Sequence, residues 1–94
     1  MITTVVQSPN FAKRKKKLKK GQTGKLDDTV RAIMENPSIG DQKIGDLQGI
    51  HVYKFKIGNN RILLAYEVVD TTLYLYSFGS HQNFYRDLSK YIHG

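Results

Sequence analysis

The sequence contains no cysteine among its 94 residues, so it can form neither a disulfide bond nor a metal site built on thiolates. This absence fits the reducing interior of a cell. The chain also lacks the apolar run of about 18 residues that a membrane span requires. Its first residues have no basic segment followed by an apolar one, which is the pattern of a secretion signal. We therefore expect a cytoplasmic protein with no membrane-spanning segment.

Acidic residues are few. Eight Asp and Glu face fifteen Lys and Arg, which gives a net charge of +7. Such a charge on a small domain points to nucleic acid, an acidic protein partner or an anionic membrane surface. The three histidines are not spaced as metal ligands and no cysteine supports them, so neither a metal nor another cofactor is expected. The apolar fraction suffices for one modest core, so residues 1–94 are read as a single domain.

The first part of the chain predicts one strand and a basic helix. Ile2–Gln7 is rich in β-branched residues and reads as a strand. Ser8 can then cap a helix that has Pro9 at its first position. The helix is expected to continue from Phe11 to about Lys20, with a thin apolar stripe because lysine and arginine fill most of it.

A second helix is expected to pair with the first as an antiparallel hairpin. Gly21–Gly24 is read as the break between them, and the second helix as Lys25–Asn36, where apolar residues recur at helical spacing. Ser38–Gly49 is read as a polar loop without regular structure. The remaining predicted elements are three strands and a last helix: His51–Ile57, Arg61–Val69, Thr72–Phe78 and Gln82–Ile92.

The resulting order is β-α-α-β-β-β-α. It predicts an α+β fold in which a helical hairpin packs on a four-stranded, mainly antiparallel sheet that the first strand completes.

The strand Val52–Ile57 has two different faces, because side chains alternate across a strand. Tyr53, Phe55 and Ile57 point one way and can enter a core. Lys54 and Lys56 point the other way, with their ammonium groups about 7 Å apart at two strand steps. Such a pair can bind phosphate.

Further polar residues can join these lysines. Arg61 and Glu67 share one face of the next strand, but the alternation does not fix whether that face is the lysine face. His81 and Tyr85 follow the third strand and add an imidazole and a phenol.

These groups suit RNA cleavage without a metal, in which the 2′-hydroxyl attacks the adjacent phosphate. The step needs a base, cations for the growing phosphorane charge and an acid for the leaving 5′ oxygen. A lysine whose pKa is lowered by a like-charged neighbour can be the base. The candidate catalytic residues are Lys54, Lys56, Arg61, His81 and Tyr85, with Glu67 as an accessory. The candidate RNA-binding residues are Lys13, Arg14, Lys16, Lys17, Lys20, Phe84 and Arg86, of which aromatic Phe84 can stack on a base.

Each of these features also has an ordinary structural explanation. Two lysines on a strand are commonly the solvated side of a half-buried sheet, and a run of lysines is commonly a solvated helix face. A histidine at a strand end is commonly a cap. Phe84 and Tyr85 can be core anchors of the last helix, and Glu67 can simply pair with a lysine.

The sequence resembles the RelE/ParE superfamily of bacterial toxins from toxin–antitoxin pairs. The resemblance covers nearly the whole chain and rests on the element order, the leading strand with its basic helical hairpin, and four segments. These segments are Leu47–Gly49, Val52–Ile57, Arg61–Glu67 and Phe78–Tyr85.

In the RelE branch, the resemblance implies a ribosome-dependent mRNA endonuclease that acts in the ribosomal A site. Lys54 and Lys56 match that branch's base and phosphate ligands. Arg61 stands two residues earlier, relative to Tyr66, than the arginine that stabilises the transition state in RelE. His81 resembles the acid–base histidine of the YafQ branch, and Tyr85 falls where RelE has a functional tyrosine.

The resemblance also implies partners and alternatives. A cognate acidic antitoxin would mask the basic surface, and operator DNA would be bound only through the antitoxin complex. The ParE branch shares the fold but inhibits DNA gyrase and lacks the nuclease residues. A DNA gyrase inhibitor and a non-catalytic basic RNA- or protein-binding module therefore remain the alternatives.

Overall fold

The computed structural model describes residues 1–80 and 84–93. Its elements are, in chain order, β1 (Thr4–Gln7), α1 (Pro9–Lys16), α2 (Lys20–Glu35), β2 (Asp41–Gln42), β3 (His51–Ile57), β4 (Asn60–Val69), β5 (Thr72–Ser80) and α3 (Phe84–His93), with 3₁₀ turns at Pro37–Ile39 and Gly45–Leu47. The predicted α+β class is confirmed. Within the described ranges, no helix is long and apolar enough to cross a membrane.

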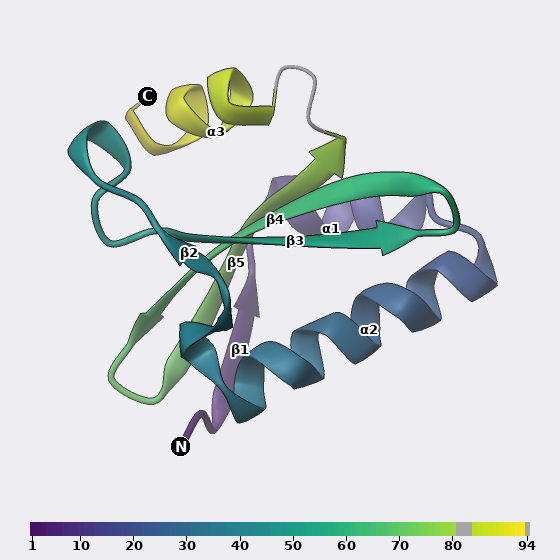
Figure 1. Cartoon of the computed structure of the whole chain (residues 1–94), viewed down its shortest axis with the longest axis horizontal. Coiled ribbons are helices and arrows are strands. Elements are labelled where there is room, and N and C mark those ends of the chain that lie inside the picture. Colours follow the sequence, from purple (N-terminus) through teal and green to yellow (C-terminus); the bar gives the residue numbers. More distant parts are fainter. Residues whose placement is uncertain (81–83, 94) are drawn as a thin grey trace.

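The strands of the described chain form one five-stranded sheet in the order β1-β5-β4-β3-β2 (Figure 1). β1 runs parallel to β5, and the other neighbouring strands are antiparallel. The predicted number of four strands was wrong, because β2 adds a fifth by pairing with His51 and Val52. Two residues are too few to show strand periodicity, so the sequence pattern of Ser38–Gly49 did not indicate this strand.

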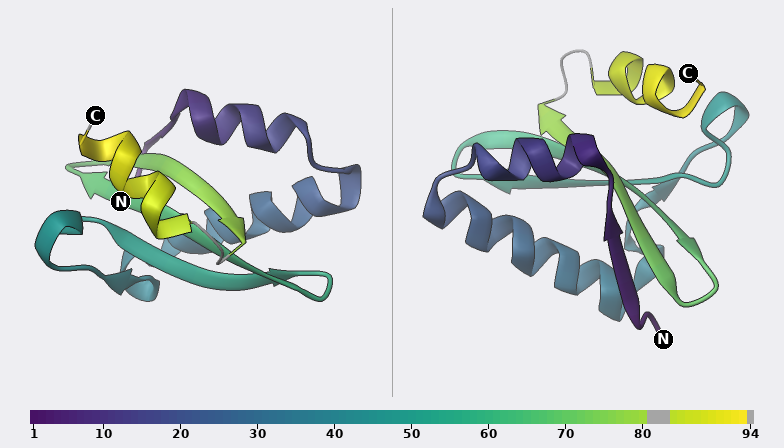
Figure 2. Two further views of the ribbon diagram at one scale, coloured as in Figure 1. Left: turned by 90° about the horizontal axis from the view of Figure 1, so that it is seen from above. Right: turned by 180° about the vertical axis from the view of Figure 1, so that it is seen from behind.

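Helices cover both faces of the sheet. Figures 1 and 2 show α1 and α2 on one side of the strands and α3 on the other. On the first side, buried Phe11, Leu26 and Leu64 belong to the larger hydrophobic cluster. On the second side, Leu63 and Leu88 belong to a smaller cluster beneath α3. Neighbouring residues of β4 thus enter two separate cores, as strand alternation requires.

The helical hairpin differs from the prediction at its turn. α1 ends at Lys16, and α2 already begins at Lys20. Leu18 lies in the connection between α1 and α2 and packs against the larger core, which fixes the position of this connection. Gly21 and Gly24, read as a break, lie inside α2. A glycine costs a helix only about 1 kcal/mol relative to alanine, which the buried face of a long helix offsets.

The start of α1 is fixed as the sequence predicted. Pro9 is the first helical residue, and the Ser8 hydroxyl accepts a hydrogen bond from the Phe11 N–H at 3.0 Å. The same hydroxyl donates to the Tyr76 carbonyl on β5 at 2.6 Å. One serine therefore caps the helix and attaches it to the sheet.

Tyr66 holds the loop after α2 against the sheet. Its buried hydroxyl donates to the Pro37 carbonyl at 2.6 Å and accepts from the Gly40 N–H at 3.0 Å. Burial raises the pKa of Tyr66 above its ordinary value of 10.0; the Gly40 hydrogen bond opposes this rise and the nearby Tyr53 adds to it. Gly40 is required here, since a Cβ on it would lie 2.6 Å from the Tyr66 hydroxyl oxygen.

Candidate functional site

Three cationic side chains surround one hollow on the sheet. Lys56 and Arg61 are direct cross-strand partners in the β3–β4 register, and Lys54 lies two residues from Lys56. Cross-strand partners share a face, so Arg61 lies on the lysine face, which the sequence had left open. The hollow measures about 180 Å³ and is lined by Lys54, Phe55, Lys56 and Arg61.

A tight hairpin sets this arrangement. Ile57 pairs with Asn60 across a two-residue turn, in which Gly58 has a φ of 61°. A positive φ favours glycine, so the turn and hence the register of Lys56 with Arg61 are encoded locally. Towards the other end of β3, α3 covers the same face through Leu88. The cations lie where that cover ends.

The side chains of Lys54, Lys56 and Arg61 form no ion pair within residues 1–80 and 84–93. Ion pairs instead join Lys15 to Asp27 at 2.9 Å and Arg31 to Asp28 at 2.7 Å, away from the hollow. Three positive groups that line one hollow can bind an anion such as phosphate, because their charges add within the same small volume. In residues 1–80 and 84–93, no group of three or more His, Asp or Glu side chains could hold a metal ion.

Glu67, predicted as an accessory residue, does not line this hollow. It stands four residues beyond Leu63, the cross-strand partner of Lys54, which is about 13 Å along a strand. Its carboxylate accepts a hydrogen bond from the Tyr76 hydroxyl at 2.7 Å. Glu67 shares a face with Arg61 but serves a different part of the sheet.

The predicted residues near α3 have different positions. Phe84 is 4 % exposed and packs in the core beneath α3, so its predicted stacking on a base does not fit the structure. Tyr85 is half-buried, and its ring packs edge to face against the Phe84 ring, with the ring centroids 5.2 Å apart. Arg86 is exposed. The prediction for His81 lies outside the described residues.

Lys43 is a neighbour of Tyr85 that the sequence analysis missed. Its ammonium nitrogen lies 5.4 Å from the centre of the Tyr85 ring, within the range of a cation–π contact. Lys43 directly follows β2, and its N–H donates to the Ile50 carbonyl at 2.9 Å. Only recognition of β2 could have indicated that this loop lysine approaches α3.

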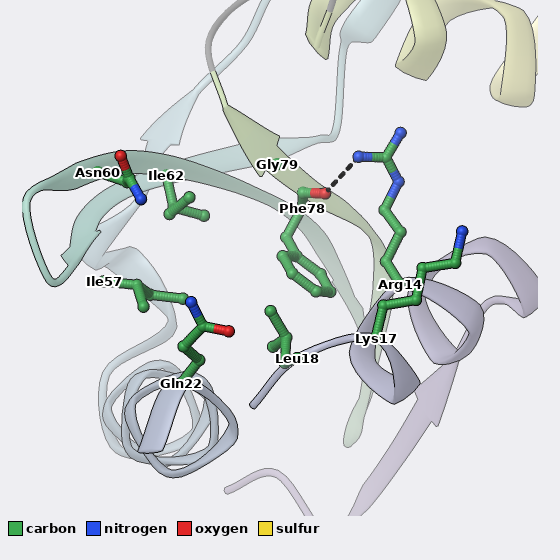
Figure 3. A pocket seen from close by; sticks show the side chains of 9 residues that line it. All are labelled: Arg14, Lys17, Leu18, Gln22, Ile57, Asn60, Ile62, Phe78 and Gly79. Atoms are coloured by element: carbon green, nitrogen blue, oxygen red, sulfur yellow. Dashed lines mark hydrogen bonds between the residues drawn. The ribbon is translucent and has the colours of Figure 1, made fainter. Parts of the chain in front are cut away.

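The basic residues of the first helix reach the same end of the sheet. Figure 3 shows Arg14 and Lys17 beside a second hollow, of about 270 Å³, into which Leu18 and Phe78 point. Arg14 donates to the Phe78 carbonyl at 3.3 Å. A Cβ on Gly79 would lie 2.7 Å from the Arg14 guanidinium, so glycine leaves room for this side chain. The exposed cations of residues 13–20 are Lys13, Arg14, Lys16, Lys17, Lys19 and Lys20.

Comparison with known proteins identifies the family. The model of a family described as the ParE-like toxin of type II bacterial toxin–antitoxin systems matches residues 5–89. The chain belongs to the ParE-like toxins. This toxin matches no curated protein sequence.

Solved structures show the same fold. The toxin is similar to a free double arginine-to-alanine mutant of Escherichia coli RelE, with 21% identity, a TM-score of 0.74, and coverage of 98% of this chain and 99% of that one. It is also similar to a chain of the intact E. coli RelBE toxin–antitoxin complex, with 20% identity, a TM-score of 0.67, and coverage of 84% and 96%.

A third similar structure is the E. coli RelE mutant in complex with a peptide of the antitoxin RelB. Identity is 20%, the TM-score is 0.67, and coverage is 93% of this toxin and 94% of that chain. These likenesses establish the fold, and the family match establishes a toxin of the RelE/ParE superfamily. Toxins of this family belong to type II toxin–antitoxin systems, so a cognate antitoxin is the partner of this one.

Proposed function

We propose that this toxin is an endoribonuclease that cleaves mRNA on the ribosome through attack by the 2′-hydroxyl. The observation that carries the proposal is the hollow formed by Lys54, Lys56 and Arg61. Phosphate is the anion that such a hollow suits, and an RNA chain presents it next to a 2′-hydroxyl nucleophile.

The reaction follows from these groups. One lysine, in its neutral form, takes the proton of the 2′-hydroxyl while the 2′ oxygen forms a bond to phosphorus. The other lysine and Arg61 stabilise the negative charge that grows on the phosphorane oxygens. The bond to the 5′ oxygen breaks, and His81 or Tyr85 supplies the proton to that oxygen. The products are a 2′,3′-cyclic phosphate and a 5′-hydroxyl.

Burial accounts for the position of Arg61. The RelE pattern puts its arginine two residues nearer to Tyr66, where this chain has Leu63. Leu63 is 0 % exposed and packs in the core beneath α3, where an arginine would lose its hydration. Arg61 is the next residue outward on the same face and is exposed. The guanidinium is thus retained on this face at a position that remains in water.

The basic first helix supports binding to ribosomal RNA. Its exposed lysines can contact phosphates, which supplies affinity without reading sequence. Arg14 and Lys17 border the end of the sheet near Asn60, next to the strand position of Arg61. Since α1 packs on the face of the sheet opposite the hollow, the proposed RNA surface passes around this end of the sheet from α1 to the hollow, and its affinity should weaken with salt.

The antitoxin in this proposal is an acidic chain that covers the lysine surface when growth continues. Its negative charge complements the net charge of +7 on the toxin. The toxin–antitoxin complex also binds operator DNA, with the DNA contacts made mainly by the antitoxin. Ribosomes lie in the bacterial cytoplasm, so the proposal assigns the toxin to that compartment.

The test is cleavage of mRNA on programmed ribosomes by wild type and by Lys54→Ala, Lys56→Ala and His81→Ala. Cleavage should yield 2′,3′-cyclic-phosphate ends, as attack by the 2′-hydroxyl requires. Lys25→Ala is the matched control, because Lys25 is an exposed lysine of α2 outside the hollow. Cleavage that is unchanged in all three variants would remove the catalytic assignment.

Inhibition of DNA gyrase is the second candidate, because the matching family is described as ParE-like. It predicts DNA-damage markers with intact mRNA after expression, whereas the nuclease predicts arrested translation with cleaved mRNA. A non-catalytic binding module predicts neither, with salt-sensitive RNA or protein binding retained. Expression of the toxin followed by mapping of mRNA ends separates these outcomes.

A further inference from the structure

The second hollow of the toxin, of about 270 Å³, lies between the connection from α1 to α2 and the end of the β3–β4 hairpin (Figure 3). Most of its lining is apolar. Leu18 and Phe78 point into it, while Ile57 and Ile62 line it from the hairpin. Its volume lies just below the range of about 300–1,000 Å³ that sites for drug-sized ligands occupy. The hollow therefore suits a single ring system rather than a long chain.

Two cations border this apolar floor. Arg14 belongs to α1 and Lys17 directly follows that helix, and both are exposed. The hydrogen bond from Arg14 to the Phe78 carbonyl, 3.3 Å long, holds the guanidinium beside the hollow (Figure 3). None of the described residues that line the hollow is Asp or Glu. An anionic group on a ligand is therefore attracted by both cations and repelled by no carboxylate of the lining.

Two side-chain amides complete the lining, those of Gln22 and Asn60. The Gln22 amide oxygen accepts a hydrogen bond from the Lys19 N–H at 2.9 Å. The NH₂ end of the same amide is turned away from that bond and can donate to a ligand. Asn60 is exposed, and its amide can both donate and accept. An apolar floor with a few polar groups at its border is the usual composition of a ligand site.

We propose that this hollow binds one unstacked nucleotide of a single-stranded RNA, with the base on the apolar floor and a phosphate at Arg14 and Lys17. Single-stranded RNA is commonly recognised through splayed-out bases that pack on aromatic side chains and form hydrogen bonds along their edges. Phe78 supplies the aromatic surface, and Gln22 and Asn60 supply the hydrogen bonds. The assignment to RNA rests on the function proposed above, whereas the affinity for a nucleotide does not.

The hairpin connects this hollow to the one that contains the catalytic lysines. Lys56 pairs with Arg61, and the next cross-strand pair joins Ile57 to Asn60. Consecutive pairs of a hairpin present their side chains to opposite faces of the sheet. The two hollows therefore lie on opposite faces at the same end of the hairpin. An RNA strand that passes around this end can place one phosphate among the catalytic cations and a nearby nucleotide in the second hollow.

The lining favours a nucleotide over other occupants. A fatty acid, or an apolar side chain of a partner protein, would cover the floor but leave the Gln22 and Asn60 amides without partners, which costs free energy. Inorganic phosphate would contact the cations and leave the floor uncovered. A nucleotide has a flat base, hydrogen-bonding groups along the base edge and a phosphate, and these match the floor, the amides and the cations.

The first probe is adenosine 5′-monophosphate, titrated to about 5 mM at low salt, where charge attraction is least screened. Methyl signals of the toxin are followed by NMR. Those of Leu18, Ile57 and Ile62 should shift because the adenine ring lies over them, while those of Ile33, buried in the core outside the hollow, should not. Absence of shifts at the three lining residues would overturn the proposal.

Two fragments of this nucleotide test whether base and phosphate bind together. Ribose 5-phosphate lacks the base and adenosine lacks the phosphate, so each should displace the nucleotide several-fold more weakly than unlabelled nucleotide does. Displacement by ribose 5-phosphate that equals displacement by the whole nucleotide would show attraction to the cations alone and would contradict the base site.

A single-stranded adenylate pentamer distinguishes RNA from a free nucleotide as the source of the ligand. It should shift the same methyl signals at a concentration lower by about tenfold or more, because its other phosphates contact the neighbouring cations. Shifts with the mononucleotide but none with the pentamer would assign the hollow to a free nucleotide and overturn the assignment to RNA.

Two substitutions test the lining itself. Lys17→Gln should weaken the mononucleotide several-fold, whereas Lys25→Gln, the same change at an exposed residue of α2 outside the hollow, should not. Ile62→Phe places a larger side chain in the hollow and should abolish the methyl shifts, with urea unfolding to show that the fold is retained. Wild-type affinity in Lys17→Gln and in folded Ile62→Phe would remove the site.

The Lys54→Ala/Lys56→Ala variant separates this inference from the proposed function. It should still bind the mononucleotide with shifts at Leu18, because those lysines do not line this hollow. Loss of the shifts would place the nucleotide at the catalytic lysines and contradict the inference. Wild-type toxin that binds the nucleotide but cleaves no mRNA would refute the nuclease alone. Wild-type toxin that cleaves mRNA but shows no shifts with either probe would refute the nucleotide site alone.

Discussion

The two faces of the β3–β4 hairpin share one backbone but differ in what covers them. On the α2 side, Leu64 and Tyr66 are fully buried beneath two helices. On the other side, α3 covers Leu63 but leaves Lys54, Lys56 and Arg61 in water. The difference teaches that one face of these strands supplies stability, while the uncovered end of the opposite face is available for binding and chemistry. Substitutions that affect only one of these properties test this separation.

The largest expected effect is on the covered face. Leu64→Ala should lower the free energy of unfolding by about 2–5 kcal/mol, because it leaves a cavity in the larger core. Lys56→Ala, on the exposed face of the same hairpin, should change it by no more than about 0.5 kcal/mol. Urea unfolding of both variants measures the contrast. Losses of similar size would show that the two faces are not separable.

The hydroxyl of Tyr66 gives the next largest effect. Tyr66→Phe removes the partner of the buried Gly40 N–H and Pro37 carbonyl, and should cost about 1–3 kcal/mol. Gly40→Ala should destabilise through the same contact, because its Cβ would displace this hydroxyl. Thermal unfolding measures both variants. Wild-type stability in either one would show that this hydroxyl does not hold the loop.

The raised pKa of Tyr66 also predicts how the stability of the fold falls at alkaline pH. Burial raises the pKa of the folded hydroxyl above 10.0, so above that pH the unfolded chain loses this proton before the folded one. The stability that the protonated Tyr66 hydroxyl contributes to the folded state is fully present below pH 10.0, and it is lost as pH rises through the pKa of the folded state. Unfolding free energies between pH 9 and 11 should therefore fall more steeply in wild type than in Tyr66→Phe. Equal slopes would contradict this role.

A smaller change should strengthen the covered side. Gly24 lies inside α2, and a Cβ there would meet nothing within 4 Å. Gly24→Ala should raise the free energy of unfolding by about 0.5–1 kcal/mol, because alanine has the higher helix propensity. Cleavage per molecule should not change. A loss of activity with increased stability would indicate that this part of α2 contacts the substrate.

The smallest effect concerns the basic helix. Lys16→Gln should lower the slope of log affinity for ribosomes against log salt by about one, since an exposed lysine there would contact one phosphate. Filter binding at several salt concentrations measures the slope. Lys25→Gln is the control, and an equal change in both variants would show a general effect of net charge.

Local sequence pattern predicted most of the fold. β3 was predicted with its observed bounds, since alternation from Tyr53 to Ile57 is clear and Gly58 marks the turn. The predicted end of α1 was wrong because lysine is a good helix former and the run of lysines shows no break. Leu18 leaves the helix to pack against the larger core, which is a tertiary contact that local pattern does not show. β2 was missed because its two residues form a strand only against β3.

The candidate site was predictable only in part. Lys54 and Lys56 followed from strand alternation, but their shared face with Arg61 depended on the β3–β4 register, which pattern alone does not give. The burial of Phe84 and the distance of Glu67 from the hollow arise from packing between distant segments. The contact of Lys43 with Tyr85 likewise depends on β2. Tertiary packing decided which polar residues meet.

The central claim is that the exposed lysine face performs the chemistry while the opposite face maintains the fold. The most direct test is the single-turnover rate of mRNA cleavage on programmed ribosomes by the Lys54→Ala/Lys56→Ala double variant, measured together with its unfolding free energy. The rate should fall by about 100-fold or more, the scale of a lost base and a lost charge stabiliser, while stability stays near that of wild type. A rate within twofold of wild type in a folded variant would contradict the account.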